Sequence, residues 1–362
     1  MLFYDIKLSK KYEFLGELTN NLIYIDENSK IPLMGVDFIG LIDRGTNVIE
    51  LKPLTLCNLK CKYCFVKAGD YHTNFIVDYK YLIKKVKSLV NIKSHHDIEI
   101  HIAPYGEILL YSDLYKLINE LWKVKGIKTV SMQTNGLMLN SKNIQMLNSN
   151  NLTRINISLN TLNEDLANYL CACSNYDLSK LLNNIETLLN TNINVLLAPV
   201  WFPGENDLDI EEIIQYVLNL RNEGYSESKI QIGIQKYLVY KTGRKLKKIR
   251  PKSWDYFYKY LSKLEKKYNL KLKLGPNDFG IHKRNGLYSP DLKKNDLIEL
   301  QIVSQGRWNW ECIGKISKNL GIKVLLKRPL TFSEDLIGKI FKAKVIKANY
   351  KDNILTASYP LQ

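Results

Sequence analysis

The chain of 362 residues is long enough for one large or two ordinary domains, with 45% apolar and 24% charged residues. These fractions are typical of a globular protein, and no apolar run approaches the roughly 20 residues that cross a bilayer. Residues 1–14 carry scattered charges and no apolar core. We therefore expect no signal peptide and no membrane association, and a reducing, cytoplasmic location. The formal net charge of +16 favours a polyanionic partner, with nucleic acid ahead of an anionic membrane.

Strand-like and helix-like stretches alternate after residue 47. The predicted strands occupy residues 48–54, 97–103, 128–133, 154–159, 193–200 and 229–235. The predicted helices lie near residues 78–91, 112–124, 141–149, 177–190, 209–222 and 252–268. Helices that alternate with short apolar strands are typical of βαβ units and a parallel sheet. The sequence therefore predicts an α/β fold over residues 47–285, a partial, TIM-like (β/α)6 barrel.

The two ends of the chain differ from this pattern. Residues 1–46 are expected to form an irregular N-terminal cap. From about residue 290 to residue 362, short alternating runs are separated by glycine or Asp-Asn turns and show no helical pattern. Such runs predict a separate small all-β barrel of roughly seventy residues.

Three of the six cysteines lie in TLCNLKCKYCF, residues 55–65, directly after the first predicted strand of the barrel. Cys57, Cys61 and Cys64 have the spacing Cys-x3-Cys-x2-Cys. In a reducing compartment, clustered thiols indicate a metal or catalysis rather than disulfides. Structural zinc sites and ordinary iron–sulfur clusters take four protein ligands, so three cysteines leave one iron of a four-iron cluster without a protein ligand.

Polar motifs follow the other predicted strands. They are PYGE at 104–107, QTNG at 133–136, SLN at 158–160, PVWFPGEND at 199–207 and QKY at 235–237. In α/β barrels the reactive centre lies at the carboxyl ends of the strands. Polar groups that converge there, around a loop of thiolates, predict a cofactor pocket.

The cysteine spacing, the aromatic Phe65 after it and the order of these motifs resemble the radical S-adenosylmethionine (radical SAM) superfamily over about residues 48–285. The resemblance implies that Cys57, Cys61 and Cys64 bind three irons of a [4Fe–4S] cluster. The fourth iron then takes the amino and carboxylate groups of S-adenosylmethionine (SAM). An electron from the cluster cleaves the sulfonium and yields a 5′-deoxyadenosyl radical, which abstracts hydrogen from the substrate. The resemblance also implies a flavodoxin- or ferredoxin-like electron donor.

The resemblance assigns further residues to SAM. Tyr105-Gly106-Glu107 resembles the Gly-Gly-Glu-Pro stretch that holds the methionyl amino group, with tyrosine in place of the first glycine and Ile108 in place of the proline. This makes Glu107 the candidate catalytic residue. The other cofactor-binding candidates are Gln133, Thr134 and Asn135 beside the sulfonium, Ser158 and Asn160 at the ribose, and Pro199, Trp201 and Gln235 to Tyr237 at the adenine.

Other interpretations of these residues, which need no SAM, stay open. The three cysteines could form a zinc site with a distant fourth ligand such as Cys171, Cys173 or His72. Glu107 could be part of a buried ion pair, and Thr134-Asn135-Gly136 could be a local turn. Cys171, Cys173 and Cys312 could supply a catalytic thiol or a second cluster, although buried inert cysteine is the commoner outcome.

The C-terminal segment, about 290–359, resembles a TRAM domain, an OB-like barrel that carries RNA to its attached enzyme, and the whole chain resembles an archaeal radical SAM–TRAM protein. The resemblance implies an RNA substrate, most of all tRNA, modified by methylation, sulfur insertion or a related reaction. The basic segment KTGRKLKKIR, residues 241–250, and Arg307, Trp308 and Trp310 are expected to contact this RNA. The alternative is a protein or small-molecule substrate, with the small barrel used for packing or oligomer contact.

Overall fold

The computed structural model describes residues 21–286, 291–349 and 352–361, and its chain divides into two compact units. The first unit comprises Met1–Asn58, Asp70–Lys128 and His282–Gln362, and the second comprises Leu59–Gly69 and Thr129–Ile281. The N-terminal stretch without a predicted signal, residues 1–14, lies outside the described residues.

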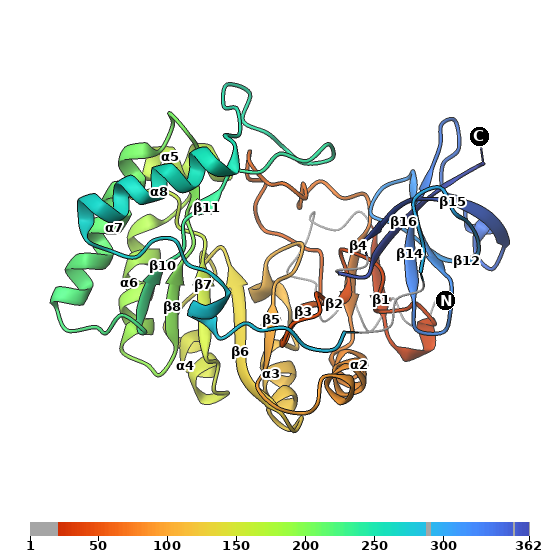
Figure 1. The fold of residues 1–362 in the computed structure, drawn as a ribbon, viewed down its shortest axis with the longest axis horizontal. Helices are drawn as coiled ribbons and strands as arrows, with labels where there is room; N and C mark the ends of the chain where they lie inside the picture. Colours follow the sequence, from red (N-terminus) through yellow and green to blue (C-terminus); the bar gives the residue numbers. More distant parts are fainter. Residues whose placement is uncertain (1–20, 287–290, 350–351, 362) are drawn as a thin grey trace. The chain divides into compact units, whose positions relative to one another are not determined.

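The first unit begins the α/β part of the fold. Strand β3 (Val48–Lys52) pairs antiparallel with β2 (Gly40–Asp43) and parallel with β5 (Ile98–Ile102). Helix α2 (Tyr79–Ile92) packs beside α3 (Leu114–Trp122), as Figure 1 shows. Their buried residues recur every three or four positions, which gives each helix one apolar face for the core.

The expectation of an irregular cap over residues 1–46 is wrong for the part that the structure describes. Strand β1 (Leu22–Ile25) pairs parallel with β4 (Asn74–Val77), and β2 pairs antiparallel with β3. Strands β1, β2 and β4 are each four residues long. A strand this short carries too little periodicity to be recognised, and β1 forms only because a distant segment pairs with it.

The C-terminal barrel is confirmed as a closed five-stranded barrel in the order β12-β13-β14-β16-β15. The strands are β12 (Leu297–Gln305), β13 (Glu311–Lys315), β14 (Gly321–Leu326), β15 (Ile340–Asn349) and β16 (Ile354–Tyr359). Along β12, alternate residues are buried, as expected for strands with one face toward a core.

This barrel is part of the first compact unit. The amide of Gly321 donates to the carbonyl of Met34 at 2.7 Å, and the amide of Leu355 donates to the carbonyl of Gly35 at 2.9 Å. The backbones approach so closely that a Cβ on Gly35 would lie 2.0 Å from the carbonyl oxygen of Gly321. Gly35 also has a φ of +97°, a conformation that favours glycine.

The second unit contains most of β6 (Ile127–Thr134), followed by β7 (Arg154–Ile157), β8 (Asn194–Leu197) and β10 (Ile230–Ile232), each parallel to the next. A short parallel pair, β9 (Val200–Trp201) and β11 (Gln235–Lys236), follows β8 and β10. The helices are α4 (Ser141–Ser149), α5 (Glu164–Cys171), α6 (Leu178–Leu189), α7 (Asp207–Asn222) and α8 (Trp254–Tyr268). Figure 1 shows α6 and α7 beside β8 and β10.

The predicted strands and helices of the α/β region are confirmed as elements, and β4 and α5 are additions to them. The curvature of a partial barrel stays a prediction. Among the described residues, no helix is both long enough and apolar enough to cross a membrane.

Candidate active site

The boundary between the compact units falls inside the cysteine stretch. Cys57 belongs to the first unit, and Cys61 and Cys64 belong to the second. All three lie at partly exposed positions and are not part of a disulfide. Within the described ranges, no three His, Cys, Asp or Glu side chains surround a single metal-ion position. A four-iron cluster has a different requirement, because each thiolate binds its own iron.

The Tyr105-Gly106-Glu107 turn lies against the residue that precedes Cys57. The amide of Glu107 donates to the carbonyl of Leu56 at 2.7 Å. A Cβ on Gly106 would lie 2.0 Å from that same oxygen, so only glycine allows the approach. The Glu107 side chain is 1% exposed, and its Oε1 accepts from the amide of Leu109 at 3.0 Å. A buried carboxylate is thus fixed next to the start of the cysteine loop, which suits it to bind an ammonium group.

The rest of the cysteine loop is fixed by a segment far along the chain. The Nε of Arg244 donates to the carbonyl of Cys61, and its Nη2 donates to the carbonyl of Ala68, both at 2.6 Å. The amide of Arg244 donates to the carbonyl of Cys64 at 2.8 Å. Next to it, a Cβ on Gly243 would lie 2.4 Å from the carbonyl oxygen of Phe65. We did not expect Arg244 to act here from the sequence, where its only signal is its place in the basic segment.

Cys171, expected to be inert, lies beside Cys61. The amide of Lys62 donates to the carbonyl of Leu170 at 2.8 Å, which brings the end of α5 against the cysteine loop. The pKa of the Cys61 thiol is raised, mainly by a hydrogen bond with Cys171 and further by burial. Burial raises the pKa of Cys64 as well.

Gln133 and Ser158 are together in the second unit, since Nε2 of Gln133 donates to Oγ of Ser158 at 3.0 Å. Thr134 and Asn135 shape the turn after β6. The Thr134 Oγ1 accepts from the amide of Gly136 at 3.0 Å, and the Asn135 Oδ1 accepts from the amide of Leu137 at 3.1 Å. The turn interpretation of this motif is therefore confirmed, and a role toward SAM stays a prediction.

Asn160 is buried and forms hydrogen bonds with two other segments of the second unit. Its Nδ2 donates to the hydroxyl of Tyr63 at 2.6 Å, and its Oδ1 accepts from the amide of Val200 at 2.8 Å. It therefore connects β9 to the cysteine loop within the second unit.

The expected adenine-flanking residues lie on or next to the β9–β11 pair, where the amide of Gln235 donates to the carbonyl of Pro199 at 2.7 Å. The indole of Trp201 is 3% exposed and stacks on Tyr260 at 4.0 Å between ring centroids. The ring of Trp201 is therefore covered by its neighbours, and a role of Trp201 toward the adenine stays a prediction.

Sequence comparison decides the family. The radical SAM superfamily model matches residues 51–217, which include the three cysteines and Glu107. The uncharacterized protein MJ0103 of Methanocaldococcus jannaschii is 35% identical over 354 residues, covering 92% of this chain and 80% of that protein. The GTP 3′,8-cyclase of Staphylococcus carnosus is 29% identical over 177 residues, covering 48% of this chain.

The chain belongs to the radical SAM superfamily. It is therefore an enzyme, and its cofactors are a [4Fe–4S] cluster and SAM. The chain spans 52% of the length of the Staphylococcus carnosus cyclase, so that similarity concerns the shared radical SAM region.

A solved structure supports the fold of this radical SAM protein. HydG, a maturase of the [FeFe]-hydrogenase, aligns with a TM-score of 0.51 at 12% identity, covering 70% of this chain and 56% of HydG. At this identity the likeness concerns the fold alone.

The donor set also suits the cofactors. A loop with three thiolates supplies the ligands for a cluster with one open iron. The buried carboxylate of Glu107, whose amide bonds to the residue before Cys57, supplies a partner for an amino group. When bound, the cluster and SAM supply the radical, and the chain holds and orients them.

Proposed function

We propose that this radical SAM enzyme modifies a structured RNA, most of all tRNA, by abstracting hydrogen from a nucleoside. Cys57, Cys61 and Cys64 hold the cluster, and Glu107 holds the amino group of SAM. The proposal rests on one observation above all: an exposed basic segment is bonded directly to the cysteine loop. The product is a methylated, thiolated or otherwise rearranged base.

The basic segment, residues 241–250, lies within a longer acid-free stretch, residues 236–254, which has eight Lys and Arg residues. Arg244 fixes it to the cysteine loop, as described above. Lys245, Lys247 and Lys248 are exposed. Cations that project from a segment anchored at the reactive loop favour a substrate with several phosphates, since each phosphate gains from a nearby cation.

Exposed aromatic rings continue this surface at the start of α8. Trp254 is 54% exposed, and Lys236 lies 5.0 Å from its ring centroid. Tyr256 is 52% exposed, and Lys252 lies 5.2 Å from its ring centroid. Surfaces that alternate cations with open rings bind unstacked RNA bases, because every base can stack on an aromatic face. The sequence contains this signal in SWDYFYKY, residues 253–260, which we had assigned only to a helix.

The expectation that Arg307 contacts RNA is wrong. Its side chain is 8% exposed and forms a two-pronged ion pair with Glu311, with Nε–Oε1 and Nη2–Oε2 distances of 3.0 Å. Trp308 stacks on Trp310 with centroids 5.5 Å apart, and Trp310 is 47% exposed. Of the three residues on this barrel expected to contact RNA, the tryptophan pair remains a candidate for base stacking.

The test is RNA binding across a salt series. Changing Lys245, Lys247 and Lys248 to Gln should weaken tRNA binding and shallow the slope of log K against log salt by about 0.7–0.9 per lost phosphate contact. Trp254→Ala should weaken binding by roughly 1–3 kcal/mol without changing that slope. The control changes Lys180, Lys263 and Lys266, exposed lysines on helices of the same unit, to Gln.

Unaltered RNA affinity in both variants, or no RNA affinity in the intact protein, would favour the second candidate, a protein or small-molecule substrate. Similarity to GTP 3′,8-cyclases favours a nucleoside triphosphate within that class. The same binding assay with GTP separates the two, because a free nucleotide makes fewer phosphate contacts and gives a shallower salt slope.

A further inference from the structure

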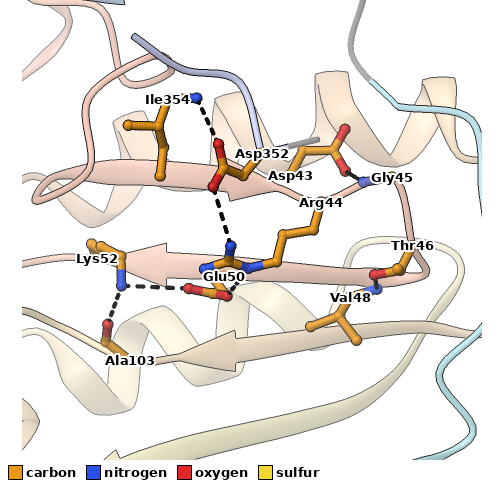
Figure 2. A network of polar contacts seen from close by, with 10 residues as sticks. All are labelled: Asp43, Arg44, Gly45, Thr46, Val48, Glu50, Lys52, Ala103, Asp352 and Ile354. Atoms are coloured by element: carbon orange, nitrogen blue, oxygen red, sulfur yellow. Dashed lines mark hydrogen bonds and ion pairs between the residues drawn. The ribbon is translucent and has the colours of Figure 1, made fainter. Parts of the chain in front are cut away.

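A chain of polar contacts crosses the first unit from the C-terminal barrel to the end of β5 (Figure 2). Asp352, just before β16, lies 3.4 Å from Nη1 of Arg44, and Nε of Arg44 lies 2.6 Å from Oε1 of Glu50. Oε2 of Glu50 lies 3.5 Å from Nζ of Lys52, which donates to the carbonyl of Ala103 at 2.8 Å. The order is therefore Asp352, Arg44, Glu50, Lys52, Ala103.

Its last member is two residues from the turn assigned to SAM. Ala103 directly follows β5, which ends at Ile102, and Pro104 joins it to Tyr105-Gly106-Glu107. The ammonium group of Lys52 also lies 4.6 Å from the ring centroid of Tyr105, within the range of a cation–π contact. Lys52 thus contacts both the carbonyl before the turn and the first ring of the turn.

The ammonium group of Lys52 lies at this position although burial of a charge costs free energy. Its side chain is 5% exposed, and burial lowers the pKa of Lys52 although Glu50 opposes this effect. A buried ammonium group persists only where charge and hydrogen-bond partners compensate its lost hydration. Glu50 and the carbonyl of Ala103 are such partners.

Arg307 of the barrel provides a second contact with the same turn. Its guanidinium carbon lies 4.3 Å from the ring centroid of Phe38, 5.3 Å from that of Tyr71 and 5.9 Å from that of Tyr105. The carbonyl of Arg307 accepts from the amide of His72 at 2.9 Å. A barrel residue therefore packs directly against Tyr105, the position where the chain departs from the glycine of the family motif.

We infer that the C-terminal barrel is a positioning element of the SAM site, and that Lys52 is the positioning residue through which it fixes the Tyr105-Gly106-Glu107 turn. The inference requires no particular substrate, so it stands apart from the RNA proposal. If the inference is right, removal of the barrel should weaken SAM binding along with any substrate binding.

The test is SAM affinity, measured anaerobically by equilibrium dialysis on the cluster-loaded protein. Lys52→Met removes the donor to Ala103 and the cation over Tyr105, and it should weaken SAM binding about tenfold while iron content stays unchanged, as for other residues that orient ligands. Lys52→Arg retains the cation and should recover most of the affinity.

Lys93→Met is the matched control. Lys93 is equally buried in the same unit and pairs with Asp43 at 2.6 Å, but its other bonds go to the carbonyls of Thr46 and Asn285 rather than to the end of β5. Lys93→Met should lower the melting temperature and leave SAM affinity at the wild-type value. Equal losses of SAM affinity in Lys52→Met and Lys93→Met would overturn the inference, since both would then reflect general destabilisation.

Arg44→Met tests the link to the barrel with a milder change, because the Arg44 side chain is 49% exposed. The change breaks the link between Asp352 and Glu50 and should weaken SAM binding about threefold. Arg44→Met therefore still tests the inference if Lys52→Met fails to fold. Wild-type SAM affinity in Arg44→Met, or in a folded Lys52→Met, would contradict the proposed role.

Discussion

Arg244 and Cys61 are 183 positions apart in the sequence, yet Nε of Arg244 donates a 2.6 Å hydrogen bond to the carbonyl of Cys61. A second bond from the same guanidinium reaches Ala68 at 2.6 Å. The two bonds connect the ends of the segment that contains Cys64. Arg244 therefore fixes the backbone conformation in which two of the three candidate cluster thiols are presented.

Arg244→Gln should weaken retention of the cluster. Hydrogen bonds from a charged donor are worth roughly 1.5–3 kcal/mol each, and a loss of this size corresponds to about tenfold or more in the rate of iron release. The measurement is the rate of iron loss to a chelator under anaerobic conditions. Lys245→Gln removes the neighbouring exposed charge without touching the loop and should release iron at the wild-type rate. Equal rates for wild type and Arg244→Gln would contradict the role of Arg244.

Glu107→Gln should preserve the cluster and weaken SAM binding. Gln is nearly the same size but lacks the charge, so a charge-assisted bond to an ammonium group, worth roughly 1.5–3 kcal/mol, is lost. Isothermal titration of the cluster-loaded variant with SAM measures this change. Glu99→Gln, a change at another buried carboxylate on β5, is the control and should bind SAM normally. If Glu107→Gln bound SAM as tightly as the wild type, the assignment of Glu107 would be wrong.

The contact between the barrel and Asp37 should make stability depend on pH in a defined window. Burial alone would raise the pKa of Asp37, but Lys323, at 2.9 Å, and Arg307 lower it below 3.8. A carboxyl with a lowered folded pKa stabilises the fold above its unfolded pKa, and this contribution disappears as pH falls through the folded pKa. Asp37→Asn should therefore lower the free energy of unfolding at pH 7 by about 1.5–3 kcal/mol, with a smaller difference as pH falls below about 3.8.

Urea denaturation at pH 7 and at pH 3 measures this dependence. Asp335→Asn is the control, because Asp335 pairs with Lys339 at the surface and such pairs are worth about 0–1 kcal/mol. A destabilisation by Asp37→Asn of the same size at both pH values would show that packing, rather than charge, holds this contact.

The α/β elements could be predicted because their signals are local. Strand β5 alternates isoleucines with Glu99 and His101. Helices α6 and α8 have apolar residues at helical spacing and capping residues at their starts, Asp177 and Ser253. Strand β1 was missed because it is stabilised by a distant partner, β4, and β2 was missed because its four residues carry too little periodicity to be recognised. The barrel was predicted from strand rhythm, but its packing against Met34 and Gly35 depends on hydrogen bonds from Gly321 and Leu355, far along the chain, which no local pattern encodes.

The site divides in the same way. The thiols and Glu107 could be predicted as candidates because their spacing and order resemble a family. The proposed roles of Arg244, Lys52 and Trp254 could not be predicted, because they depend on neighbours that are distant in sequence or on exposure. Arg307 was misassigned for a related reason, since a basic residue beside tryptophans resembles an RNA-binding surface until Glu311 is seen to pair with it.

The central claim is that Cys57, Cys61 and Cys64 hold a [4Fe–4S] cluster that cleaves SAM. The most direct measurement is iron and sulfide content of the anaerobically purified protein, together with release of 5′-deoxyadenosine from SAM after reduction. We predict about four irons and four sulfides per chain. Alanine at any one of the three cysteines should abolish both the cluster and SAM cleavage, whereas Cys171→Ala should keep four irons. Stoichiometric zinc in place of iron, or a cluster that survives Cys57→Ala, Cys61→Ala or Cys64→Ala, would contradict the claim.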